Sequence, residues 1–394
     1  MKYLLTWLLA IPMVLTAQPY TPGESYFGAN NYIEYLAGNL PIILSAPHGG
    51  YLIPGSIPDR DCPDCAYLMD TRTQELIRAL AEAIHNRTGC YPHVIINRLH
   101  RRKLDANRDL PEAADGDPIA GQAWAEFQGF IDSAENAVVQ TYGKGLYIDL
   151  HGHAHAVQRL ELGYLLSKSN LQLPGATLNL GNYVAKSSIR RLALQNVNTI
   201  DHTGLLRGEY SLGSMLSNRG YPTVPSSTDP FPDEAESYFD GGYNTERHGS
   251  WPGGTIDGIQ IECNWTGVRD SLPNVVRFAD SLSIALLDYL EKHYFGSLAG
   301  SWCDSLPQTS TGSPVAAVQV FPNPYCSSFF VQTDDAAGSW TAEVYDFSGN
   351  LLLTKVLSAQ APVEVMPKRR EKVWVVVRKD GQVVAMRSVL RYCR

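Results

Sequence analysis

Residues 146–153 read LYIDLHGH, an apolar run that leads into an acid, His151, a glycine and His153. Such a run before a polar, glycine-bearing turn indicates a buried strand that ends in a loop. Residues 41–50 (PIILSAPHGG) repeat the pattern and carry His48 near their end. In open α/β sheets, the loops at the carboxyl ends of the strands build the sites. Two strand ends that each supply an imidazole therefore predict a zinc site.

The pattern around these two strands predicts the fold class. Apolar strand-like runs alternate with helical patterns from residue 33 to about residue 294. The expected strands are 41–46, 93–97, 145–150 and 257–262, and the expected helices are 71–87, 119–141, 186–196 and 274–294. Thr71 and Gln74 have the spacing of a capping box at the start of the first helix. This alternation predicts an α/β fold with a mostly parallel twisted sheet flanked by helices.

Changes in composition divide the chain into four parts. Residues 1–17 contain Lys2 and an apolar run too short to span a bilayer, which predicts a signal peptide. Residues 18–302 are the expected catalytic domain, and residues 303–314, rich in Ser, Thr and Pro, are the expected linker. In residues 315–394 the apolar positions alternate with period two, which predicts a small all-β sandwich domain.

The charge of the chain limits its partners. A formal net charge of -8 and a pI of about 5.7 argue against nucleic acid, whose phosphates require a basic face. A small-molecule or short-peptide substrate is compatible with this charge. No later apolar run is long enough to cross a membrane. We therefore expect a protein that is exported through the periplasm and then secreted or attached to the cell surface.

The sequence contains seven cysteines, and this odd number leaves at least one thiol without a partner in the chain. Residues 62–65 (CPDC) offer a local disulfide, half of a metal knuckle, or a partner for Cys90. A four-cysteine zinc site is not expected, because the chain has no second CxxC motif. Export permits disulfides, and we favour that interpretation.

A catalytic zinc ion needs three protein ligands, so His48 and His151 require a third. The candidates are His153 and two acids at the start of the 71–87 helix, Asp70 and Glu75. Asp70 has an alternative role as the N-cap of that helix, which is a common use of aspartate. The sequence leaves the choice between cap and ligand open.

Glu262 lies near the end of the apolar run 257–262, where an unpaired carboxylate would be costly to bury. It is either the partner of a buried arginine or a general base that takes a proton from water.

The polar segments that follow the strands offer further site residues. Residues 98–109 are rich in arginine and form either a solvated basic loop or a clamp for a substrate anion, which arginine binds through two parallel hydrogen bonds. Residues 240–258 are rich in glycine and carry Tyr243. They form either a lid over the site or an ordinary surface excursion.

Six short motifs in this order resemble the N-formylglutamate amidohydrolase family. They are PHGG at 47–50, Asp70 at a helix start, DANR at 105–108, DLHG at 149–152, GGY at 241–243 and QIE at 260–262. The resemblance covers roughly residues 30–295. The family is similar in fold to zinc carboxypeptidases and to zinc N-acetylmuramoyl-L-alanine amidases, so the resemblance implies a zinc-hydrolase fold.

The same resemblance implies roles for individual residues. It implies one zinc ion held by His48, Asp70 and His151, with Glu262 as the catalytic base. Asn107 and Arg108 resemble the pair with which carboxypeptidases grip a substrate carboxylate, and Tyr243 falls in a motif of the substrate site. Arg101 or Arg102 would stabilise the oxyanion, and Arg102 is our choice.

The tail resembles the C-terminal sorting domain of the type IX secretion system. The resemblance rests on VFPNP at 320–324 and VYDFSG at 344–349, which follow a linker at the chain end. It implies the type IX machinery as a partner and export across the outer membrane.

We therefore expect a secreted zinc amidohydrolase that cleaves an N-acyl amino acid or a short peptide with a free carboxylate. One alternative is an amidase of peptidoglycan stem peptides. Another is a non-catalytic surface binding protein on a hydrolase scaffold, which the joint presence of His48, His151 and Glu262 opposes.

Overall fold

The structure is a computed structural model. It describes residues 20–296 except 64 and 252, residue 302, and the segments 318–321, 328–333, 338–345, 351–358, 362–366, 373–380 and 382–389. The expected signal peptide and linker lie outside the described residues.

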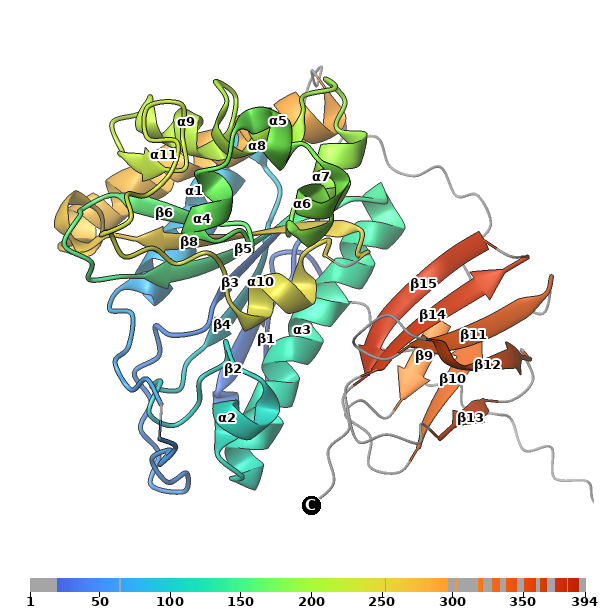
Figure 1. Cartoon of the computed structure of the whole chain (residues 1–394). Helices are drawn as coiled ribbons and strands as arrows, with labels where there is room; N and C mark the ends of the chain where they lie inside the picture. The colour runs from blue at the N-terminus through green and yellow to red at the C-terminus, as the bar shows by residue number, and fades with distance from the viewer. Residues whose placement is uncertain are drawn as a thin grey trace, which may run out of the picture.

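An eight-stranded sheet forms the centre of the first unit (Figure 1). Its order is β1-β2-β4-β3-β5-β8-β6-β7. The strands are β1 (Ser25–Phe27), β2 (Ile33–Leu36), β3 (Ile42–Ala46), β4 (His93–Asn97), β5 (Gly145–Gly152), β6 (Leu160–Gly163), β7 (Thr223–Val224) and β8 (Ile256–Cys263). The adjacent strands β4, β3, β5 and β8 are parallel, and β2 and β6 flank them antiparallel. The predicted α/β class is confirmed, with antiparallel additions at both edges.

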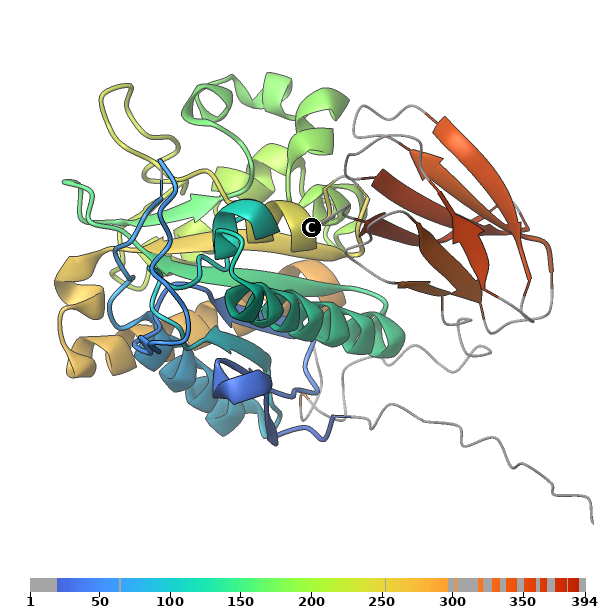
Figure 2. The ribbon, with the colours of Figure 1, turned by 90° about the horizontal axis from the view of Figure 1, so that it is seen from below.

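Helices cover both faces of this sheet (Figures 1 and 2). The chain steps outward from β3 to β4 through α1 (Thr73–Thr88) and returns to β5 through α3 (Pro118–Tyr142). Because parallel crossovers are right-handed, these steps in opposite directions leave the two helices on opposite faces. Helix α11 (Leu272–Leu290) packs beside α1, and α10 (Tyr243–His248) packs on β5 and β8. The central strands are therefore buried on both sides and are almost continuously apolar.

The expected helix boundaries need two corrections. Helix α1 has no capping box, because its N-cap is Arg72 in the left-handed conformation and the Gln74 amide donates to the Gly49 carbonyl. The expected helix 186–196 is broken, because Ser187 is extended between two shorter helices. The sequence also did not predict the run of short helices α4 (Lys168–Leu171), α5 (Gly175–Leu178), α6 (Gly181–Lys186), α7 (Arg190–Gln195), α8 (His202–Arg207) and α9 (Leu212–Ser217). Other short helical elements are α2 (Leu110–Ala114), which precedes α3, the 3-10 helix η1 (Ala29–Asn31), and the π-helices η2 (Trp265–Arg269) and η3 (Glu291–Phe295).

The C-terminal part consists of antiparallel sheets, as the period-two pattern predicts. One sheet has the order β13-β10-β9 and the other β12-β11-β14-β15. The strands are β9 (Val318–Phe321), β10 (Phe329–Thr333), β11 (Trp340–Tyr345), β12 (Leu351–Leu357), β13 (Val363–Val365), β14 (Val373–Lys379) and β15 (Gln382–Val389). Phe329 from the first sheet and Val344 and Val375 from the second belong to one buried cluster, as in a sandwich.

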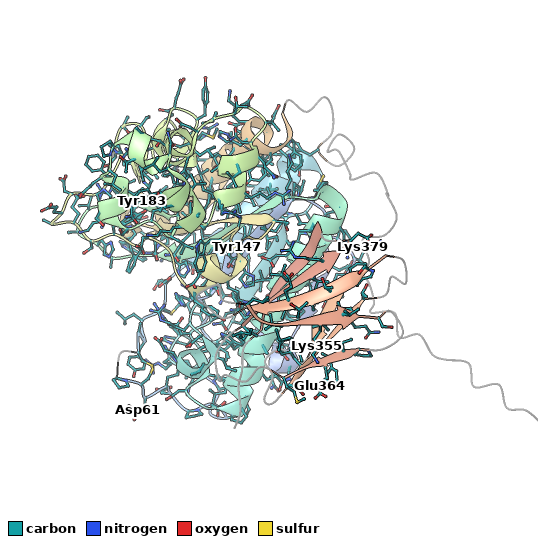
Figure 3. The ribbon with its side chains drawn as sticks, turned by 45° about the vertical axis from the view of Figure 1, so that its right-hand side comes forward. Asp61, Tyr147, Tyr183, Lys355, Glu364 and Lys379 are labelled. Atoms are coloured by element: carbon teal, nitrogen blue, oxygen red, sulfur yellow. A yellow bond between two sulfur atoms is a disulfide. The ribbon has the colours of Figure 1, made fainter. Side chains whose placement is uncertain are left out.

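Cys62 and Cys65 form a disulfide in the loop that Asp61 marks in Figure 3. Cys90 is also disulfide-bonded, whereas Cys263 is a buried free thiol. None of the described helices is long and apolar enough to span a bilayer.

Candidate metal and catalytic site

Three buried side chains converge at the carboxyl end of the sheet. His48 follows β3, Asp70 precedes α1, and His151 lies near the end of β5. The Nδ1 atoms of the two imidazoles are 3.1 Å apart, and each lies 3.4 Å from Asp70 Oδ2. The structure therefore brings together the three residues that the sequence proposes as ligands.

The separation of these donors fits a zinc ion. Tetrahedral donors at about 2.0–2.1 Å from zinc lie roughly 3.3–3.4 Å from one another. Two imidazole nitrogens and one carboxylate are a common catalytic set, and such sites leave a fourth position open. The atoms of His48, His151 and Asp70 have this spacing without any rearrangement.

The second nitrogen of each imidazole contacts a buried carboxylate. His48 Nε2 lies 2.6 Å from Asp105 Oδ1, and His151 Nε2 lies 2.7 Å from Asp149 Oδ2. A carboxylate at this position accepts the Nε2 proton, fixes the tautomer and leaves Nδ1 free to bind a metal. Both rings are therefore oriented as metal ligands, and this is independent support for the site.

The charges around these atoms favour a cation between them. Burial opposes ionisation of Asp70, but the neighbouring side chains of His151 and His48 hold the pKa of its carboxyl far below the usual range. Burial likewise opposes ionisation of Asp105, and the charges of His48 and Arg101 lower its pKa. The pKa of Asp149 is lowered as well, against the effect of burial, so three buried carboxylates around the two imidazoles are ionised and a divalent ion would compensate their charge.

Glu262 lies beside His151 across the sheet. In the parallel pairing of β5 with β8, His151 is opposite Glu262, so the two side chains share one face. Burial raises the pKa of Glu262 to about 8. Gln260 donates to its Oε1 at 3.0 Å, and no described arginine forms an ion pair with it. A carboxylate with a raised pKa next to three candidate metal ligands suits proton transfer.

The two arginines considered for the oxyanion point in different directions. Arg101 donates through Nε to Asp105 Oδ2 at 2.8 Å, and its Nη1 lies 3.9 Å from Asp70 Oδ1. Arg102 instead lies 3.8 Å from Asp59 and is about half exposed. The geometry therefore places Arg101, and not the Arg102 that we favoured, against the ligands.

The residues proposed to grip a substrate carboxylate are only partly available. Asn107 is buried, its Oδ1 accepts from the Asn244 backbone at 2.8 Å, and its Nδ2 lies 3.4 Å from His151 Nε2. Arg108 is partly exposed and pairs with Glu112 at 2.8 Å. Tyr243 begins α10, where burial raises its pKa. Their roles toward a substrate stay predictions.

The other candidate ligands lie outside the three-donor cluster. Glu75 accepts from the Tyr51 hydroxyl at 2.8 Å. His153 Nε2 contacts the Arg159 carbonyl at 2.8 Å, and its Nδ1 accepts from the His155 backbone. Asp70 is not the helix cap considered above, because its Oδ2 accepts from the Gly152 backbone and faces the imidazoles.

Within residues 240–258, expected as a lid or a surface excursion, Gly242 and helix α10 lie against the site and form one of its walls. Helix α10 packs on β5 and β8, and its Asn244 and His248 are hydrogen-bonded to Gln128 on α3. A Cβ on Gly242 would lie 2.4 Å from the Asn107 amide nitrogen, so this close approach requires glycine. Tyr147, labelled in Figure 3, lies on β5 beneath this wall, with its ring 5.4 Å from that of His248.

One buried arginine joins the segments that carry the site. Arg269 donates to the carbonyls of Cys263, Thr71 and His153 at 3.0, 2.6 and 3.0 Å. These carbonyls lie next to Glu262, next to Asp70 and two residues beyond His151, respectively. A Cβ on Gly152 would lie 2.2 Å from the guanidinium carbon, so glycine is required there as well.

Asp105 and Asp149 are the functional residues for which the sequence suggested no role. For Asp149 a signal was available, because residues two apart on a strand share a face and Asp149 precedes His151 by two. Asp105 begins the DANR motif, but no periodicity places it beside His48, because it reaches that ring through the path of an irregular loop.

Comparison with known proteins reveals distant structural similarity only. No protein family and no curated protein matches the sequence. The chain is similar to N-formylglutamate amidohydrolase from Ralstonia eutropha JMP134, with 12% identity, a TM-score of 0.39, and coverage of 64% of this chain and 93% of that one. It is similar to succinylglutamate desuccinylase from Chromobacterium violaceum, with 10% identity, a TM-score of 0.33 and 78% of each chain covered. Product-bound Csd4, a cell shape determinant protein from Helicobacter pylori, is more distant, with 10% identity, a TM-score of 0.24, and coverage of 89% and 95%. TM-scores this low support no argument about activity, so a proposal about activity has to rest on the geometry of the site.

Proposed function

We propose that this protein is a zinc-dependent amide hydrolase. The observation that carries the proposal is the donor triangle of His48, Asp70 and His151, with sides of 3.1, 3.4 and 3.4 Å, beside the buried carboxylate of Glu262. When bound, zinc would act as a Lewis acid that polarises the scissile carbonyl and lowers the pKa of water.

Residues of the chain carry out proton transfer, stabilisation of the oxyanion and orientation of the imidazoles. Glu262 takes a proton from the attacking water, a role that suits a buried carboxylate with a raised pKa. Arg101 is oriented by Asp105 and offers its guanidinium to the negative charge that develops on the carbonyl oxygen. Asp105 and Asp149 hold the two imidazoles in the metal-binding tautomer.

The substrate class that we propose is an N-acyl amino acid or a short peptide with a free carboxylate. Arg108 supports this choice, because its guanidinium is partly exposed and its ion pair with Glu112 is a surface pair of small energetic value. A substrate carboxylate would compete with Glu112 for the same donors. The net charge of -8 disfavours a polyanionic substrate.

Metal content and turnover test this proposal together. The wild type should bind one zinc ion and release amine from a panel of N-formyl and N-acetyl amino acids. His48→Ala should lose both properties. His85→Ala is the matched control, since His85 stacks on Tyr91 away from the site, and it should keep both. Full zinc occupancy in His48→Ala would overturn the ligand assignment, and zinc-loaded wild type without any amidase activity would overturn the function.

We also propose that residues 315–394 act as a sorting domain for type IX secretion, so that the enzyme works outside the cell or on its surface. The sandwich-like pair of antiparallel sheets supports this reading of the tail. In a host with that machinery, a chain that ends at Trp302 should remain in the periplasm. Secretion of the truncated chain would contradict the proposal.

A further inference from the structure

A second histidine–carboxylate pair lies one strand beyond the proposed base. His155 Nδ1 lies 2.8 Å from Glu161 Oε1, and Glu161 is fully buried on β6. The other oxygen of Glu161 accepts from the Phe239 backbone at 2.9 Å, so the carboxylate is held at both ends. The metal and base machinery described above does not use this pair.

The sheet register places this pair in line with the site. In the antiparallel pairing of β6 with β8, Glu161 is opposite Glu262, which in turn is opposite His151. Residues directly opposite one another share a face of the sheet, so these three side chains form a row. Neighbouring strands are about 4.8 Å apart, which places Glu161 roughly 10 Å from His151 on the far side of the base.

The pair is not suited to hold a second metal ion. His153, His155 and Glu161 lie close enough to be considered as ligands. Both ring nitrogens of His153 are already used, however, by the Arg159 carbonyl and the His155 backbone. Only one imidazole and one carboxylate remain.

The orientation of His155 suits proton donation. Glu161 accepts the Nδ1 proton, and the described residues provide no hydrogen-bond partner for Nε2. The ring is stacked on Phe239, with centroids 4.6 Å apart and planes at 23°, and the side chain is 19% exposed. The imidazole is therefore fixed by two contacts, and its Nε2 has no partner among the described residues, as in catalytic histidine–carboxylate pairs.

We propose that His155 is a further catalytic residue, which protonates the leaving amine. This inference rests on the amide hydrolase function proposed above. In the step, the C–N bond breaks, its electron pair goes to nitrogen, and the Nε2 proton of the imidazolium is transferred to that nitrogen. Glu262 holds the proton taken from water, and both groups return to their starting states by exchange with solvent. Glu161 is the positioning residue.

The test compares two leaving groups on one acyl group. An amide nitrogen must be protonated to leave, whereas a thiolate leaves without a proton. His155→Gln should lower kcat about 10²-fold or more for an N-acyl amino acid, within the usual range for general acid catalysis. It should change kcat less than about threefold for the matching S-acyl 2-mercapto acid. Zinc content should stay at the wild-type level, and His85→Gln should match the wild type on both substrates.

Two results would overturn the role of His155: an unchanged amide rate, or equal losses on the amide and the thioester. Glu161→Gln should reproduce the selective loss in weaker form, because the imidazole keeps its place but loses its anionic partner. A different result would test the proposed hydrolase function itself. If the zinc-loaded wild type turns over neither substrate, both the hydrolase function and the role of His155 are wrong.

Discussion

Replacing Asp105 by asparagine tests whether the buried carboxylates prepare the imidazoles for a metal. Asp105 Oδ1 lies 2.6 Å from His48 Nε2, and its Oδ2 accepts from Arg101 at 2.8 Å. Asparagine keeps the shape of the side chain but removes the charge, and it replaces one of the two oxygens by an amide group. His48 Nδ1 then becomes a weaker donor, and the ring loses the partner that fixes its tautomer.

The expected effect follows from this contact. Loss of the partner of a metal-binding histidine typically weakens binding about 10–100-fold, or roughly 1.4–2.7 kcal/mol. We expect Asp105→Asn to fall in the upper half of this range, because the carboxylate is buried and lies only 2.6 Å from the ring. His48, Asp70 and His151 all remain, so binding should be weakened and not abolished.

Competition with a chromophoric zinc chelator at pH 7.5 measures this change. Asp59→Asn is the matched control, since it makes the same chemical change at a carboxylate that is about half exposed and bound to Lys103. The control should bind zinc like the wild type. Circular dichroism establishes that both variants are folded. If folded Asp105→Asn binds zinc as tightly as the wild type, the carboxylate does not support the metal site and the proposed role of Asp105 is wrong.

Three further predictions concern the base, the substrate clamp and the core. Glu262→Gln should keep its zinc and lose turnover by about 10²–10⁴, as metal analysis and kinetics would show; a normal rate would exclude Glu262 as the base. Arg108→Lys should mainly raise KM for a substrate with a free carboxylate, and an amidated analogue should be poor for the wild type and no worse for the variant. Burial lowers the pKa of His93 to about 3, so the neutral imidazole is favoured in the folded state. The contribution of His93 to the free energy of unfolding should therefore be complete above about pH 6.5 and should decrease as the pH falls, by roughly 2 kcal/mol at pH 5. Urea unfolding from pH 5 to 7.5 measures how the free energy of unfolding changes with pH. His93→Asn, which keeps an acceptor for the Tyr35 hydroxyl, should make this change smaller.

Strand ends were the part of the site that the sequence could predict. Hydrophobic runs locate β3, β5 and β8, and the residues at their carboxyl ends must meet at one edge of a parallel sheet. His48, His151 and Glu262 were therefore found from local patterns. The run of small helices between β6 and α10 was missed, since each of them is too short to show a helical period.

Such patterns could not predict where the side chains of loop residues point. Arg101 and Arg102 are neighbours in sequence, yet one contacts the acids of the site and the other contacts Asp59. The direction of each side chain depends on backbone angles that no periodicity encodes. In the same way, Asp70 was recognised as either cap or ligand. Only the contacts of residues 70–72, just before α1, with Arg269 and with the end of β5 decide between the two.

The three hydrogen bonds that Arg269 donates have a consequence for the order in which the domain folds. All three proposed ligands have been synthesised once β5 is complete, whereas Arg269, which binds carbonyls next to Asp70 and near His151, comes after β8. A nascent chain that ends between β5 and β8 thus carries every proposed ligand but lacks the contact that joins the segments of Asp70 and His151. Long-range contacts of this kind form late in folding. We therefore expect firm metal capture only once the segment after β8 has been made and has folded against the earlier strands.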